Sequence, residues 1–166
     1  MRNLAWWLGF VGAVGFAVWV IETTSPGLPD RVAMHFDGDG MPGRFAAREA
    51  YVAAFHTLIS IMAGVMALVA KGMSVLPMHL INMPNREYWL DPRRQQQTRD
   101  YLVRWSIVSA VLMQFFLIGM HLCIVDAHRL QPIRLGEPFW WVVGIFVLSI
   151  LAMIVIMVRR FSSSRR

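Results

Sequence analysis

Residues 139–158 read FWWVVGIFVLSILAMIVIMV, an apolar run without a single charged side chain. An α-helix rises about 1.5 Å per residue, so a run of this length crosses the roughly 30 Å hydrocarbon core of a bilayer. A buried helix in a small soluble domain does not need so long an apolar stretch. The run therefore predicts a membrane-spanning helix.

Three further apolar segments precede this one. They cover residues 4–21, 52–70 and 105–125, and each is long enough to span a bilayer. Tryptophans, which favour the membrane interface, lie near the segment ends: Trp6, Trp7, Trp105, Trp140 and Trp141. The sequence thus predicts an all-α fold, an integral membrane four-helix bundle that forms a single membrane domain over residues 1–166.

The composition of the whole chain agrees with this class. Hydrophobic residues make up 57% of the chain and charged residues 16%, whereas a soluble domain carries about a quarter charged residues. The net charge is +6, and the basic residues lie at the ends of the apolar segments. They do not form a basic helix interleaved with aromatic residues, which argues against a nucleic-acid partner. The single cysteine, Cys123, excludes an intramolecular disulfide bond.

The basic residues predict the orientation of the segments. One side of a four-span chain holds both termini and the second connection, with Arg2, Lys71, Arg86, Arg93, Arg94, Arg99, Arg104, Arg159, Arg160, Arg165 and Arg166. The other side holds Arg31, Arg44, Arg48, Arg129 and Arg134. Because lysine and arginine accumulate on the cytoplasmic side, both termini are expected there. Residues 23–51 then form an outer loop and residues 72–100 an inner loop.

Both loops are expected to carry structure. In the outer loop, Val32, Met34 and Phe36 alternate with other residues and predict a short extended stretch, which residues 37–40 end as a turn. Residues 46–52 are expected to be a helical lead-in to the second span.

In the inner loop, Asp91 can cap a helix that begins at Pro92. Nothing breaks this helix before Val125, so residues 93–100 should form a helical cytoplasmic stub before the third span.

Polar residues within the apolar segments are the first candidates for a functional site, because they are costly to place in lipid. They gather on one face of each of two helices: His56, Ser60, Gly64 and Lys71 on the second, and Ser106, Gln114 and His121 on the third. These helices are antiparallel neighbours, so His56 and His121 should lie nearly level close to the outer surface.

Two interpretations of this histidine pair remain open. Imidazole titrates near neutral pH and binds zinc or copper, so the pair can form a proton-responsive or metal-binding cluster. The other interpretation is structural, with each histidine hydrogen-bonded within the bundle. No His-x-x-x-His spacing supports a metal, so the structural interpretation is favoured. The complete predicted binding set is His35, Phe36, Asp37, Asp39, Arg44, His56 and His121.

No catalytic or cofactor motif is present in the sequence. The Asp37-x-Asp39 pair suggests calcium, but position twelve of such a loop, where a bidentate acid is needed, is Arg48. Gly-x-Ser-x-Gly, a phosphate-binding loop and Cys-x-x-Cys are also absent. We therefore expect no cofactor and no enzymatic activity.

Two stretches resemble a bacterial membrane family of undefined function, whose domain also forms the first part of SdpI-type bacteriocin-immunity proteins. Residues 28–40, LPDRVAMHFDGDG, are similar to the family's Leu-Pro, a short strand ending in His-Phe, and a following glycine. Residues 82–90, NMPNREYWL, are similar to its Pro-Asn-x-Glu-Tyr-Trp-Leu run, matched here by Pro84, Asn85, Glu87, Tyr88 and Trp89. Phe45 stands where relatives carry tryptophan. The resemblance implies a small bacterial inner-membrane protein that presents an outer loop.

The leading hypothesis is a multi-pass binding, sensing or immunity-type module whose outer loop recognises an extracytoplasmic peptide or protein. An alternative is a proton- or metal-linked transporter subunit, which predicts a homo-oligomer. A third is a membrane-surface enzyme that uses His35, Asp37 and Asp39 as acid and base groups.

Overall fold

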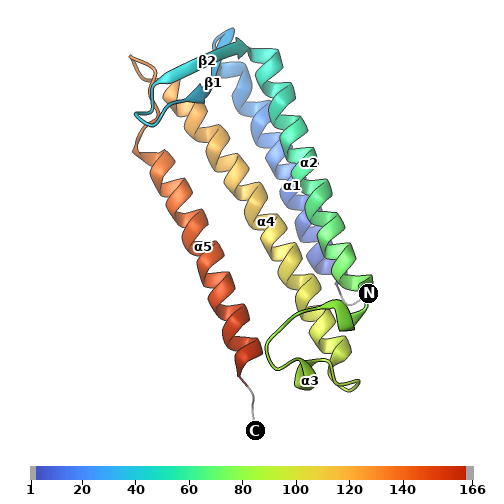
Figure 1. Cartoon of the computed structure of the whole chain (residues 1–166). Helices are drawn as coiled ribbons and strands as arrows, with labels where there is room; N and C mark the ends of the chain where they lie inside the picture. The colour runs from blue at the N-terminus through green and yellow to red at the C-terminus, as the bar shows by residue number, and fades with distance from the viewer. Residues whose placement is uncertain (1–2, 164–166) are drawn as a thin grey trace.

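Four long helices account for most of the chain in the computed structural model, which describes residues 3–163 (Figure 1). They are α1 (Leu4–Thr24), α2 (Arg48–Val75), α4 (Gln95–Ala127) and α5 (Glu137–Ser162). All four are long and apolar enough to cross a membrane, and each predicted segment lies within one of them. The prediction of four apolar helices is confirmed. Three arginines of the charge count lie outside the described residues: Arg2, Arg165 and Arg166.

The helices run side by side, with a β-hairpin at one end and the short helix α3 (Arg86–Trp89) at the other (Figure 1). We call these the hairpin end and the α3 end. α4 packs against both α1 and α2, and α5 packs on α4. α4 is therefore the central helix. Its 33 residues span about 50 Å, so it extends past the apolar segment predicted for it at the α3 end.

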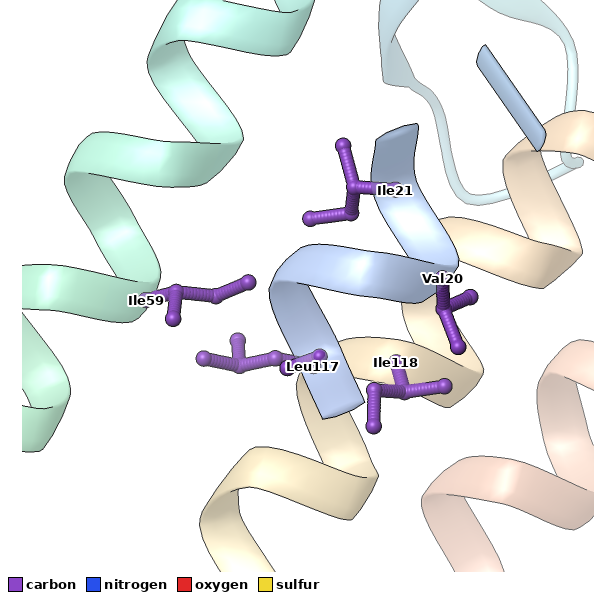
Figure 2. Packing of buried hydrophobic residues seen from close by; sticks show 6 residues of the cluster. Val20, Ile21, Ile59, Leu117 and Ile118 are labelled. Carbon is purple, nitrogen blue, oxygen red and sulfur yellow. The ribbon is translucent and has the colours of Figure 1, made fainter. Parts of the chain in front are cut away.

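The core lies between α1, α2 and α4 and is built mainly from small and branched apolar side chains. Toward the hairpin end it consists of Ala17, Val20, Ile21, Ile59, Leu117 and Ile118 (Figure 2). Toward the α3 end it consists of Phe10, Ala70, Val103, Ile107 and Ala110. The alanines let the helix backbones approach closely, so the branched side chains of neighbouring helices can interdigitate.

α5 is the least buried of the four helices. Its most apolar stretch contains no buried residue, and Trp140 and Trp141 are 66% and 69% exposed. A continuous apolar surface of this kind is unusual in a soluble protein. It suits a helix that is surrounded by acyl chains.

The connection between α1 and α2 forms an antiparallel hairpin of β1 (Arg31–Phe36) and β2 (Pro42–Ala47). The extended stretch predicted in the outer loop is confirmed as β1. This small sheet is a correction to the all-α prediction. The predicted helical lead-in over residues 46–52 is wrong at its start, because Ala46 and Ala47 pair with β1 and the helix begins only after them.

The turn of the hairpin depends on Asp37 and Gly40. An Asp37 carboxylate oxygen accepts hydrogen bonds from the backbone N–H groups of Asp39 (3.0 Å) and Met41 (2.8 Å), which is ordinary turn chemistry. Gly40 has a φ of 77°, and a Cβ there would lie 3.2 Å from the Leu135 carbonyl oxygen. The Leu135 N–H donates to the Gly40 C=O at 2.9 Å. Glycine at this position therefore lets the hairpin join the α4–α5 connection.

The start of α4 also differs from the prediction, because the helix begins at Gln95 and not at Pro92. Asp91 still organises this start. Its Oδ1 accepts a hydrogen bond from the Arg93 N–H (2.8 Å), and its C=O accepts one from the Gln95 N–H (2.9 Å). From Gln95 the helix continues without interruption, as predicted.

Gly119→Ala should destabilise the contact between α4 and α5. A Cβ at Gly119 would lie 2.8 Å from Cγ1 and 3.2 Å from Cγ2 of Val142, so the Val142 side chain or α5 itself would have to shift. We expect the free energy of unfolding in mild detergent to fall by about 1–3 kcal/mol. Gly144→Ala is the matched control, because nothing lies within 4 Å of its added Cβ. It should be neutral or stabilising by at most about 1 kcal/mol. Equal losses in the two variants would contradict the close contact.

Candidate functional site

A pocket at the hairpin end brings together most of the predicted binding residues. Its volume is about 440 Å³, and it lies between the hairpin, α4 and the start of α5. We call it the hairpin pocket. Its polar lining includes His35, Asp37, Asp39 and Arg134. Its apolar lining includes Met34, Phe36, Met120, Phe139 and Trp140.

The polar side of the hairpin pocket is held by the turn. The Asp37 carboxylate is engaged by two backbone N–H groups, and Nε of Arg134 donates to the Asp39 C=O at 3.2 Å. Within residues 3–163, no hydrogen-bond or ion-pair partner meets the Asp39 carboxylate. The hairpin pocket therefore offers an available negative charge next to an aromatic and aliphatic wall.

The remaining predicted residues, Arg44, His56 and His121, do not line this pocket. Arg44 lies opposite His35 in the hairpin ladder and is exposed. The predicted binding set is therefore divided into a group around the hairpin pocket and three residues with other surroundings.

His121 is the centre of a buried hydrogen-bond network that joins three helices. Its side chain is inaccessible to solvent. Nδ1 lies 2.8 Å from the hydroxyl of Tyr51 on α2, and Nε2 lies 2.7 Å from the hydroxyl of Thr24 on α1. The structural interpretation of this histidine therefore has direct support in the geometry.

The direction of each hydrogen bond in this network follows from the Thr24 hydroxyl. That hydroxyl has one proton, which it donates to the Val20 C=O at 2.7 Å. It must then accept from Nε2–H of His121, so Nδ1 of this ring accepts from the Tyr51 hydroxyl. This assignment leaves a neutral imidazole with both nitrogens satisfied, as a buried polar group requires.

A second histidine, His128, ties the hairpin to the end of α4. Its Nε2 accepts a hydrogen bond from the Ala33 N–H of β1 at 3.0 Å, and its Nδ1 lies 2.8 Å from the Ile124 C=O. Val32 and Ala33 are fully buried, so the base of the hairpin is packed on the helices. The hairpin pocket thus has one wall that is fixed to the bundle.

His56 has different surroundings from His121. Its Nε2 lies 3.2 Å from a carboxylate oxygen of Glu22, close enough for an ion pair when the imidazole is protonated. The two residues line a separate pocket of about 460 Å³ together with Arg48 and Glu49. Among residues 3–163, no group of three or more His, Cys, Asp or Glu residues is placed to hold a metal ion.

The predicted polar faces of the second and third spans do not face each other. Ser60, Gly64 and Lys71 of α2 are exposed, whereas Gln114 of α4 is fully buried. The reason is that α2 turns its apolar side, with Ile59 and Ala70, toward α1 and α4. The two helices therefore do not form a polar pathway between them.

The predicted inner motif lies at the α3 end and holds the last turn of α5. The Asn85 side-chain amide donates to the carbonyl oxygens of Phe161 and Ser162, both at 3.0 Å, and Nε1 of Trp89 donates to the Phe161 C=O at 3.1 Å. Carbonyls at the end of a helix have no partners within that helix, so these bonds satisfy them. Pro84, Glu87 and Tyr88 line pockets beside this contact.

Three residues with central positions were missed by the sequence analysis: Thr24, Tyr51 and His128. Tyr51 carried a usable signal, because a tyrosine at the start of a membrane-spanning helix commonly buries its ring and needs a partner for its hydroxyl. Thr24 and His128 carried no such signal, since each lies at a helix end among ordinary loop residues.

No family model matches the chain, and neither a curated protein nor a solved structure matches it. The resemblance of its two motifs to the SdpI-type family stays a prediction.

Tyr51→Phe should destabilise the hairpin end without changing its shape. The variant keeps the buried ring but removes the hydroxyl that donates to His121, leaving Nδ1 buried without a partner. An unsatisfied buried group costs about 1–3 kcal/mol, measurable as a lower free energy of unfolding in detergent. Thr57→Ala is the control, because the Thr57 hydroxyl is exposed and bonds only to its own helix, at Ala53. A Tyr51→Phe variant as stable as the wild type would contradict the network.

Proposed function

We propose that this chain is a non-enzymatic binding or sensing module of the bacterial cytoplasmic membrane, with both termini in the cytoplasm. It recognises an extracytoplasmic peptide or protein through the hairpin pocket. The resemblance of residues 28–40 and 82–90 to the SdpI-type family supports the bacterial setting. The orientation is supported by the basic residues of the α3 end: Lys71, Arg86, Arg93, Arg94, Arg99, Arg104, Arg159 and Arg160.

The observation that carries this proposal is the hairpin pocket. An acidic turn and an apolar wall meet there, on a hairpin whose base is fixed by His128 and by buried Val32 and Ala33. Ligand sites commonly combine an apolar lining with a few well-placed polar groups. A fixed base also favours binding, because little conformational freedom is lost when the ligand arrives.

The lining suggests the chemistry of the ligand. The Asp39 carboxylate offers a place for a cation, and Phe139 and Trp140 offer an aromatic surface. A basic side chain next to an aromatic or aliphatic one in a peptide provides both groups. The ligand class that fits best is therefore a cationic, amphipathic peptide or an exposed loop of that composition.

The orientation can be tested with single cysteines at Asp37 and Glu87, introduced into a Cys123→Ala background. A maleimide that does not cross the cytoplasmic membrane should label position 37 in intact cells, provided that the reagent can reach the outer face of that membrane. Position 87 should react only after the membrane is permeabilised, because it follows the basic α3 end. Labelling of both positions after permeabilisation is the control, and the reverse pattern would contradict the proposed orientation.

Binding can be tested with fluorescent peptides that pair one aromatic residue with lysine or arginine, compared with peptides that replace the basic residue with glutamate. Fluorescence anisotropy with reconstituted protein should show preference for the basic set. Asp39→Asn and Trp140→Ala should each weaken binding about fivefold or more, the effect of losing one anchoring contact.

Two controls match these variants. Asp30→Asn removes an acid of the same loop, and Trp141→Ala removes a tryptophan as exposed as its neighbour, but neither residue lines the hairpin pocket. Both should bind the peptides like the wild type. If neither peptide set binds, or if control and pocket variants lose affinity equally, the proposed ligand class is wrong.

A further inference from the structure

The α3 end contains a pocket that, within residues 3–163, is lined by two arginines and by no carboxylate. Its volume is about 500 Å³, and its lining consists of Tyr88, Trp89, Arg94, Gln97, Arg160 and Ser163. We call it the arginine pocket. Two positive charges around one pocket repel each other, and an anion between them removes that repulsion.

Both arginines are positioned by aromatic rings. The guanidinium carbon of Arg94 lies 4.0 Å from the ring centroid of Tyr88. That of Arg160 lies 4.0 Å from the centroid of Tyr101 and 5.5 Å from that of Trp89. A guanidinium stacked by its face keeps the N–H groups at its edge free to donate, and these match the oxygens of a phosphate group.

Arg160 has no counter-charge in the part of the chain that the structure describes. No carboxylate within residues 3–163 forms an ion pair with it or with Arg94, and Nε of Arg160 is buried without a hydrogen-bond partner among these residues. A buried N–H of a charged group that lacks a partner is costly. An anion in the arginine pocket would supply the counter-charge that residues 3–163 do not.

An apolar pocket of about 480 Å³ lies next to the arginine pocket, between α2, α4 and α5. Its lining includes Met66, Leu102, Met157 and Phe161. The Phe161 ring contacts Trp89 of the arginine pocket, with the two centroids 5.3 Å apart. A charged pocket and an apolar pocket thus share one aromatic boundary.

We propose that the arginine pocket binds the phosphate headgroup of an anionic phospholipid, with part of an acyl chain in the apolar pocket. Arg160 follows Val158, the last residue of the fourth apolar segment, by two positions. This places it at the depth of the lipid headgroups. A headgroup with net negative charge fits better than a zwitterionic one, because the described lining of the arginine pocket offers no carboxylate to an ammonium group. With the orientation proposed above, this lipid belongs to the cytoplasmic leaflet. That assignment is the one part of the inference that rests on the proposed function.

The test uses the full chain in mild detergent and thermal unfolding followed by a thiol-reactive dye. Cys123 is the single cysteine and is buried, so unfolding exposes it to the dye. Phosphatidylglycerol should raise the midpoint temperature, whereas equal amounts of phosphatidylcholine, or inorganic phosphate, should raise it little. The double variant Arg94→Gln/Arg160→Gln should bind phosphatidylglycerol about tenfold more weakly, because charge-assisted hydrogen bonds are lost.

Arg93→Gln is the matched control, since Arg93 is an exposed neighbour that does not line the arginine pocket. It should keep the full response to phosphatidylglycerol. Native mass spectrometry gives a second readout that does not depend on stability, namely the number of anionic lipids retained by each variant.

Three results would overturn the proposal. The first is an equal response to phosphatidylglycerol and phosphatidylcholine, and the second is an unchanged anionic-lipid response in the double variant. The third is a response to inorganic phosphate as large as the response to the lipid, which would assign the arginine pocket to a free phosphate ligand. All three results are measured in detergent. They therefore test lipid binding independently of the orientation and of the peptide ligand proposed above.

Discussion

Acyl chains offer no hydrogen bonds, so every peptide group of a membrane-spanning segment must find its partner within its own helix. This constraint organises the whole molecule. The same constraint applies to hydroxyl groups within these segments. Those of Ser106, Ser109 and Ser149 each donate a hydrogen bond to a carbonyl of the preceding helical turn. Apart from Gln114, which is fully buried near the middle of α4, polar chemistry gathers at the two ends of the helices, where the hairpin pocket and the arginine pocket lie.

The two ends of the bundle satisfy their polar groups in different ways. At the hairpin end, the hydroxyls of Thr24 and Tyr51 satisfy His121 as a neutral group, and the helices are joined without charge. At the α3 end, cations rest on aromatic rings, and the side chains of Asn85 and Trp89 satisfy the last carbonyls of α5. Backbone groups left unpaired by helix termination thus attach a loop to the bundle.

The sequence predicted the four helices well because the length of an apolar run and the thickness of a bilayer are both fixed quantities. β1 was predictable from its alternation, but β2 was not, since residues 42–47 (PGRFAA) become a strand only by pairing with β1. His56 and His121 do lie at the same end of the bundle, since they contact Glu22 and Thr24 of α1, but the choice of the facing side of α2 was wrong. In lipid, a small or weakly polar residue such as Ser60 can face outward, so polarity alone does not identify the inner face.

The attachment of α5 has a mechanical consequence. Nearer the hairpin, α5 contacts α4 through Val142 against Gly119 and through the stacked rings of Phe146 and Phe116. At its other end, Arg160 and Phe161 contact the ring of Tyr101, which also belongs to α4. Val142 is about 8 Å from the start of the helix and about 30 Å from its end, at 1.5 Å per residue. α5 is therefore fastened near both of its ends, while the apolar surface between them faces outward. A shift of α5 beside Phe139 and Trp140 would therefore be resisted at its far end, where Tyr101 of α4 and the side chains of Asn85 and Trp89 hold the last turn.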